Sequence, residues 1–254
     1  MNTNSLTIEM KQKIVIIPDV HGRPFWREVL TNKEDIIVFL GDYSDPYEYE
    51  GFTHKDAVRE LTDIVQFKKD NPERVILLLG NHDVPYIHPN FPTYRYSNEL
   101  KNEYRKLFTD EPDLFQIAYN LRLNDIDYLF THAGVNKEWF EMMSPNLINT
   151  NLDISVELNR AWKETPEIFA TVGRARGGNK TPSPIWADYE EHDAFYGYPD
   201  SIQIFGHTQQ LKNPILVGSM WCLDCRKVFV LEEDTISYYT EFGDKMELSF
   251  GKDI

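Results

Sequence analysis

The sequence predicts an α/β protein, and three observations support that fold class. Five short runs rich in Ile, Val, Leu or Phe each end abruptly in a polar cluster, which is typical of buried β-strands. Segments with the apolar spacing of a helix lie between these runs. After Asn213, further runs follow one another with only short polar turns between them, which predicts antiparallel strands at the end of the sheet system.

The predicted elements follow one another regularly along the chain. Residues 54–70 carry apolar side chains that mostly share one helical face, so we expect a helix there. Residues 171–184 concentrate Gly, Pro and Arg and predict a loop. The five strand-like runs lie at 13–22, 35–45, 74–83, 126–134 and 201–208, and the antiparallel strands are expected at 214–224, 227–234 and 235–242.

The composition is that of a packed globule. Of 254 residues, 41% are hydrophobic and 13% aromatic, which is too apolar for a disordered acidic chain. A chain of this length buries roughly three quarters of its unfolded surface and lies near the upper limit of one domain. We therefore expect an N-terminal tail over 1–12 and a single domain over 13–254, with 87–108 and 140–184 as candidate cap segments over the site.

The charge excludes several classes of partner. Lys and Arg number 26 against 41 Asp and Glu, a net charge of −15, which repels nucleic acid and anionic lipid. The longest apolar runs, 36–40 and 75–79, are far shorter than the ~18 to 20 residues of a membrane span. The first 13 residues lack the apolar core of a signal peptide, and two cysteines are too few for a disulfide framework. We expect a cytoplasmic protein with no nucleic-acid or membrane partner.

Metal-capable side chains stand at the ends of all five strand-like runs. In open α/β sheets, ligands bind beyond the carboxyl ends of strands, so side chains placed there converge on one crevice. Asp19 and His21 are two residues apart, which directs both to the same side of an extended chain. Carboxylate, imidazole and amide ligands without thiolate suit zinc, iron or manganese. The full set is Asp19, His21, Asp42, Asn81, His82, His132 and His207.

Five motifs in order resemble the calcineurin-like metallophosphoesterase superfamily: DVHG at 19, GDYSD at 41, GNHD at 80, THAG at 131 and FGHT at 205. The chain looks closest to the phosphoprotein phosphatase and diadenosine tetraphosphatase branch. GDYSD supplies a second aspartate, and Gln209 stands where other branches usually carry a further ligand His. The resemblance implies a four-layer α/β/β/α sandwich of two mixed sheets flanked by helices.

The resemblance also implies a dinuclear site. One metal ion would be held by Asp19, His21 and Asp42, and Asp42 would bridge to a second ion held by Asn81, His132 and His207. The ions would be divalent or trivalent, namely Mn²⁺, Fe²⁺/³⁺ or Zn²⁺. A hydroxide between them would attack phosphorus in line. As the resemblance further implies, His82 would then protonate the leaving oxygen, and Asp45 would orient the imidazole.

One part of the family pattern is missing. The phosphoprotein phosphatases continue GDxxD with Arg-Gly, and that arginine clamps phosphate, whereas Pro46 and Tyr47 stand here. Arg174 and Arg176 in the 171–184 loop are candidate replacements, because an arginine can contact phosphate through two N–H groups. A solvated basic loop is the alternative. Arg23, directly after DVHG, is a third candidate.

Three functions fit these features. The first is a phosphatase acting on phosphomonoesters, with phosphoserine or phosphothreonine proteins as the first substrate. The second keeps the site but hydrolyses dinucleoside polyphosphates or other nucleotides. The third is a metal-binding interaction scaffold without turnover, against which the complete ligand set argues.

His54, His88 and His192 lie outside the motifs and are expected at the surface.

Overall fold

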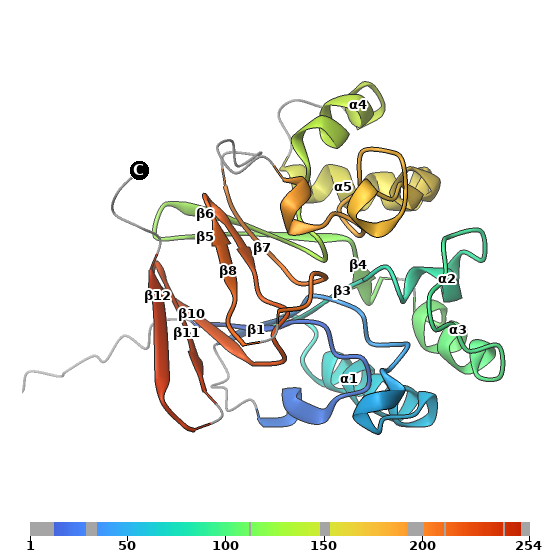
Figure 1. The fold of residues 1–254 in the computed structure, drawn as a ribbon, viewed down its shortest axis with the longest axis horizontal. Coiled ribbons are helices and arrows are strands. Elements are labelled where there is room, and N and C mark those ends of the chain that lie inside the picture. The colour runs from blue at the N-terminus through green and yellow to red at the C-terminus, as the bar shows by residue number, and fades with distance from the viewer. Residues whose placement is uncertain are drawn as a thin grey trace, which may run out of the picture.

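The chain forms two β-sheets between two groups of helices (Figure 1). The computed structural model describes residues 13–28, 35–111, 113–147, 153–192, 201–210, 212–240 and 242–249. The seven-stranded sheet has the order β12-β11-β10-β1-β2-β3-β4, and the five-stranded sheet has the order β5-β6-β7-β9-β8. The first sheet comprises β1 (Ile14–Ile17), β2 (Ile36–Phe39), β3 (Val75–Leu78), β4 (Phe115–Gln116), β10 (Phe229–Glu232), β11 (Thr235–Tyr239) and β12 (Lys245–Ser249). The second comprises β5 (Ala118–Leu123), β6 (Ile126–Thr131), β7 (Ile202–Phe205), β8 (Ile215–Val217) and β9 (Met220–Cys222).

Both sheets are mixed. Strands β1 to β4 are parallel to one another, whereas β10 pairs with β1 in antiparallel orientation and continues antiparallel through β11 and β12. In the second sheet β6, β7 and β9 are parallel, and β5 and β8 close the two edges in antiparallel pairing. The carboxyl ends of β1, β2 and β3 therefore lie at one edge of the first sheet, and those of β6 and β7 at one edge of the second.

Helices cover the outer faces of the sheets. In Figure 1, α1 (His54–Asp70), α2 (Val84–Ile87) and α3 (Lys101–Thr109) lie apart from α4 (Lys137–Leu147) and α5 (Ile154–Glu164), which cover the second sheet. Helix α1 begins with a capping box, in which Thr53 and Asp56 satisfy each other's backbone N–H groups. Short 3-10 helices connect the elements at Pro24–Glu28, Glu48–Glu50, Pro166–Ala170, Arg174–Arg176 and Tyr189–Glu191.

Alternation along the strands divides the interior into layers. On β1, Ile14 and Ile16 face a core shared with Phe130 and Ile204 of the second sheet, whereas Val15 belongs to the core under the helices. The side chains of β2 and β3 alternate in the same way, as the pleat of a strand requires. The predicted α/β fold, with two mixed sheets flanked by helices in four layers, is confirmed.

The individual elements agree closely with the sequence. All five runs form strands, and the helix expected over 54–70 is α1 with those bounds. The antiparallel strands after Asn213 are also present, but they divide between the sheets: β8 and β9 join the second, and β10 and β11 join the first. No helix in the described part of the chain is long and apolar enough to cross a membrane. The tail over 1–12 lies outside the described residues.

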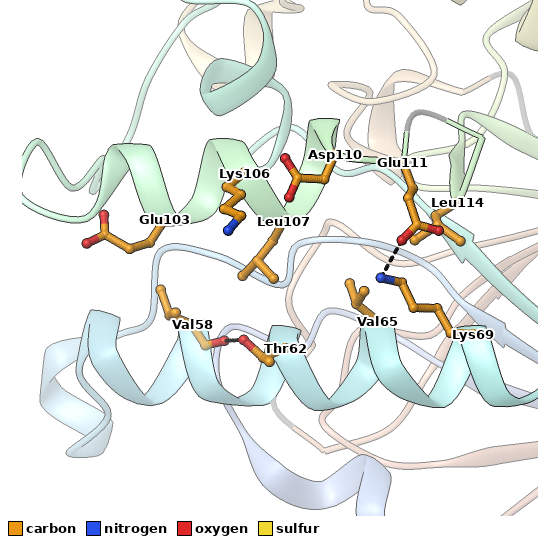
Figure 2. A pocket seen from close by; sticks show the side chains of 10 residues that line it. All are labelled: Val58, Thr62, Val65, Lys69, Glu103, Lys106, Leu107, Asp110, Glu111 and Leu114. Atoms are coloured by element: carbon orange, nitrogen blue, oxygen red, sulfur yellow. Dashed lines mark hydrogen bonds and ion pairs between the residues drawn. The ribbon is translucent and has the colours of Figure 1, made fainter.

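A hollow of about 280 Å³ lies between α1 and α3 (Figure 2). Val58, Val65 and Leu107 are among its apolar lining residues, and Lys69 on one helix pairs with Glu111 beyond the other. None of the predicted metal ligands or catalytic residues lines it. This hollow is therefore separate from the predicted metal site.

Candidate metal centre

The predicted ligands from both sheets meet in one place. All six are buried, although charged and amide side chains ordinarily lie at the surface: Asp19, His21, Asp42, Asn81, His132 and His207. Within the second sheet, Gly206 N donates to His132 O at 2.8 Å, and His207 N joins this sheet to the first by donating to Asp19 Oδ1 at 2.9 Å. The fold thus brings together side chains that are as much as 188 positions apart in the sequence.

Asp42 lies at the middle of this group. Its Oδ2 atom is 3.4 Å from His21 Nε2 and 3.5 Å from His132 Nε2. Two sets of residues could each hold a metal ion, His21 with Asp42 and His82, and Asp42 with His132 and His207. Asn81 Oδ1 and His207 Nδ1 lie 3.0 and 3.1 Å from His132 Nε2. Asp19 Oδ2 is 3.9 Å from His21 Nε2. Asp42 is the residue shared by both sets.

The chemistry of these donors fits a cation. His21 Nδ1 donates to Ser44 O and His132 Nδ1 donates to Leu40 O, both at 2.8 Å. These bonds place the ring proton on Nδ1 and leave a lone pair on each Nε2 atom. Each lone pair faces the carboxylate of Asp42, an arrangement that a positive ion between them would stabilise. His207 Nε2 is also buried, with no hydrogen-bond partner in the described structure.

The pKa values of the ionisable groups shift in the directions expected for a buried site. Burial, followed by the positive charge of neighbouring groups, holds the pKa of His21 and of His207 well below the ordinary value, which keeps both neutral. Burial raises the pKa of Asp19 to about 6, with the charge of His132 opposing and that of Asp42 adding to the rise. Burial and the charge of Asp19 raise the pKa of Asp224 well above its usual range.

The backbone at the site is held in an uncommon conformation. His21, Asp42, Asp45 and His207 have φ values of 44°, 52°, 54° and 63°, in the left-handed region that non-glycine residues rarely adopt. Such residues cost about 1 to 3 kcal/mol each and persist where the surroundings fix them. Close packing adds to the constraint, since a Cβ atom at Gly80 would lie 2.1 Å from Asp42 Oδ1.

Asp83 is a structural residue that the sequence analysis did not single out. Its buried carboxylate accepts hydrogen bonds from the backbone N–H groups of Asp42, Tyr43 and Ser44, at 2.7, 3.0 and 3.1 Å. It also accepts from Gly80 N at 3.0 Å. Asp83 therefore ties the GDYSD turn to GNHD and fixes the direction of Asp42. Its position as the last residue of GNHD was the available signal.

His82 and Asp45 form a pair beside the ligands. His82 Nδ1 lies 3.0 Å from Asp45 Oδ2 and 3.1 Å from Tyr94 O, both acceptors, so Nδ1 carries a proton. Tyr86 donates its hydroxyl proton to Asp45 Oδ1 at 2.5 Å. Burial lowers the pKa of His82, but the charge of Asp42 and then the hydrogen bond and charge of Asp45 raise it above its ordinary value.

The three predicted phosphate-binding arginines differ in their partners. Arg23 is buried, and its guanidinium pairs with Glu50 at 2.6 Å and donates to Asp19 O at 3.2 Å. Arg176 pairs with Asp188 at 2.9 Å and donates to Thr208 Oγ1 at 3.1 Å, near His207. Arg174 lies exposed in the same 3-10 helix. Arg23 thus contacts the backbone of a predicted ligand and Arg176 the residue that follows one, and each already has a carboxylate partner.

The expectation that His192 lies at the surface is wrong. Its side chain is buried, and Nε2 lies 2.9 Å from Ala133 O. A Cβ atom at Gly134 would lie 2.7 Å from that Nε2 atom, so the imidazole packs directly against the THAG turn. His54 and His88 are partly buried. No local pattern indicates this packing, because residue 192 is distant from Gly134 along the chain.

Metal binding is expected to stabilise the fold less in acid. A carboxylate must lose its proton to bind a metal ion, and the pKa of Asp19 without metal is about 6. At pH 5 the proton would therefore compete and reduce metal affinity about tenfold relative to neutral pH. A ligand whose free concentration is 100 times its Kd adds about 2.7 kcal/mol to the free energy of unfolding, which raises Tm by about 5 to 10 °C for a domain of this size.

Thermal unfolding with excess Mn²⁺ or with EDTA at pH 5 and pH 7.5 measures this effect. We expect the Mn²⁺-dependent rise in Tm to be larger at pH 7.5. Asp70→Asn, on the exposed end of α1, is a matched control that should behave like the wild type. An equal rise at both pH values would contradict the assignment of Asp19 as a ligand.

Comparison with known proteins identifies the family of the chain and agrees with its fold. The model of the calcineurin-like phosphoesterase family matches residues 12–211. No curated protein matched the sequence. The structure is similar to a cold-active protein-tyrosine phosphatase of the psychrophile Shewanella sp., with a TM-score of 0.59, 17% identity, and coverage of 94% of this chain and 81% of that one. It is also similar to a Saccharomyces cerevisiae protein serine/threonine phosphatase with similarity to human phosphatase PP5, with a TM-score of 0.52, 13% identity, and coverage of 88% and 74%. At these identities the two structures support the fold.

Proposed function

Because the chain belongs to the calcineurin-like phosphoesterase family, a family of phosphoric ester hydrolases, we propose that it is a dinuclear metal-dependent phosphatase acting on phosphomonoesters. The observation that carries this proposal is the position of Asp42 Oδ2, 3.4 Å from His21 Nε2 and 3.5 Å from His132 Nε2. One carboxylate thus belongs to two sets of possible metal ligands.

The proposed ligands divide around Asp42. Asp19, His21 and Asp42 would hold one ion, and Asp42, Asn81, His132 and His207 the other. Mn²⁺, Fe²⁺/³⁺ and Zn²⁺ all suit this mixture of oxygen and nitrogen donors. Bound there, the ions would supply Lewis acidity toward phosphoryl oxygens and lower the pKa of water.

His82 would act as the general acid. Its Nδ1–H is held by Asp45 Oδ2 and Tyr94 O, which fixes the ring and leaves Nε2 to donate a proton to the leaving oxygen. Asp45 would position the imidazole and stabilise its protonated form. The Tyr86 hydroxyl holds the other oxygen of Asp45 and so restricts rotation of that carboxylate.

Phosphoserine and phosphothreonine proteins are the proposed first substrates. One structural neighbour is described as a protein-tyrosine phosphatase and the other as a protein serine/threonine phosphatase, so phosphorylated proteins are the class from which this first substrate is chosen. A hydrolase of dinucleoside polyphosphates or other nucleotides is the second candidate. Tyr94 is 53% exposed and lies 5.9 Å from the ring of Trp186, which gives a nucleobase an aromatic surface near His207. The cytoplasmic location stays a prediction.

A substrate panel under one metal condition tests these proposals. Phosphoserine, phosphothreonine and phosphotyrosine peptides, diadenosine tetraphosphate, a mononucleotide and a phosphodiester would be compared with Mn²⁺ and with EDTA. We expect hydrolysis of phosphopeptides that EDTA abolishes. Preference for diadenosine tetraphosphate would support the second candidate. Metal-loaded protein without turnover on any substrate would support the scaffold alternative.

A further inference from the structure

The segment after α2 places one more arginine beside His82. Arg95 is an exposed residue whose Nη2 atom lies 3.4 Å from His82 Nε2. Its Nε atom donates to Asp45 O at 3.0 Å. The same segment supplies Tyr94 O to His82, and Ser97 N donates to the Tyr86 hydroxyl at 2.9 Å. Several hydrogen bonds therefore hold residues 94–97 against the His82–Asp45 pair and Tyr86.

The guanidinium of Arg95 lies over the aromatic ring of Tyr47. Its central carbon lies 3.8 Å from the centroid of the Tyr47 ring, well within the range of a cation–π contact. The Tyr47 ring in turn packs edge-on against His21, with centroids 5.0 Å apart. Arg95 has φ 53°, so its backbone adopts the uncommon left-handed conformation also found at the ligands. This arrangement restricts the side chain before any ligand binds.

Arg95 differs from the other arginines of the site in its charge environment. Arg23 is paired with Glu50 and Arg176 with Asp188. Within the described part of the chain, no carboxylate forms an ion pair with Arg95, although the protein carries a net charge of −15. The polar contacts of its side chain with the described residues are to a carbonyl oxygen and an imidazole nitrogen. Its charge is therefore available to an anion.

From these contacts we infer that Arg95 is a substrate-binding residue that contacts the phosphoryl group of the substrate. A guanidinium carries five N–H donors and no acceptor, and the contacts of Arg95 with Asp45 O and His82 Nε2 leave donors for a further partner, so an anionic oxygen bound beside the imidazole suits this site. This inference rests on the proposed phosphatase function and adds a residue to it. It assigns the phosphate contact to a segment outside the five sequence motifs.

Phosphate affinity of the metal-loaded full-length protein tests the inference. Calorimetry with inorganic phosphate and kinetics with p-nitrophenyl phosphate would compare the wild type with Arg95→Ala and Arg95→Lys. A hydrogen bond to a charged group contributes about 1.5 to 3 kcal/mol, so we expect Arg95→Ala to raise the phosphate Kd and the KM roughly 10- to 100-fold. Arg95→Lys should restore part of the affinity, because lysine keeps the charge but not the planar fork.

Arg105→Ala is the matched control, since Arg105 is exposed on α3 in the same region of the chain. It should leave the fold intact, as expected for a surface substitution, and change phosphate affinity less than about threefold. Unchanged phosphate affinity in Arg95→Ala would overturn the inference, even if turnover fell, because Arg95 would then act only through His82. A wild type that binds no phosphate and hydrolyses no substrate would instead overturn the proposed function.

Discussion

Asp42→Asn is expected to abolish tight binding of both metal ions and to lower phosphatase turnover roughly 1,000-fold or more, since two-metal catalysis supplies several kcal/mol. The substitution keeps the size of the side chain but removes the charge shared between His21 and His132. The amide oxygen of asparagine can still accept the hydrogen bond that His82 N donates to Asp42 Oδ1 at 2.9 Å, so we expect the local turn to keep its conformation.

The metal-free variant is expected to be at least as stable as the metal-free wild type. The charge of Asp42 is among the causes that raise the pKa values of Asp19, Asp83 and Asp224, so its removal relieves repulsion among buried carboxylates. Metal content of the dialysed protein, Tm and turnover would be measured, with Asp70→Asn as the control. Full metal content with normal turnover would refute the shared-ligand assignment.

His82→Asn is expected to slow hydrolysis of alkyl phosphates about 10²- to 10⁴-fold, the usual contribution of a general acid. The loss should be far smaller with p-nitrophenyl phosphate, because nitrophenolate leaves with little need of a proton. The structural basis is the His82–Asp45 pair, in which Asp45 holds Nδ1 at 3.0 Å and Nε2, beside Arg95 Nη2 at 3.4 Å, is the nitrogen that would donate to the leaving oxygen.

Turnover on both substrates under saturating metal would be compared with that of His88→Asn. His88 packs against Trp162 with ring centroids 5.0 Å apart and has no contact with the predicted ligands or with His82, so its substitution should leave the ratio of the two rates unchanged. Equal losses on alkyl and nitrophenyl phosphates in His82→Asn would assign His82 to metal binding with His21 and Asp42 and not to proton transfer.

The sequence predicted the architecture well because its strong signals were local. A buried strand needs a short apolar run, and its polar end is visible in the same few residues, as at Ile36 to Asp42. The helix over 54–70 was equally clear from its apolar face. The division of the last strands between two sheets was not visible, because nothing local distinguishes β9 of the second sheet from β10 of the first.

The surroundings of the ligands were less accessible to sequence reasoning. Asp83 is the last residue of GNHD, yet its hydrogen bonds with three successive backbone N–H groups depend on how the GDYSD and GNHD turns pack together. The same holds for His192, which is buried only because it packs against the THAG turn. Arg23 looked available beside DVHG, whereas the fold pairs it with Glu50.

By itself, the sequence determined which chemical groups stand at the ends of the five strands, because strand and turn are adjacent in the chain. It also determined the net charge of −15, which disfavours nucleic acid. The tertiary structure alone decided that Asp42 is common to two sets of possible ligands. It also decided that Arg95 lies beside His82 with no carboxylate partner among the described residues, whereas Arg23 is paired with Glu50. The physical reason is that the charge environment of a side chain depends on contacts across distant segments, which residue type and spacing do not specify.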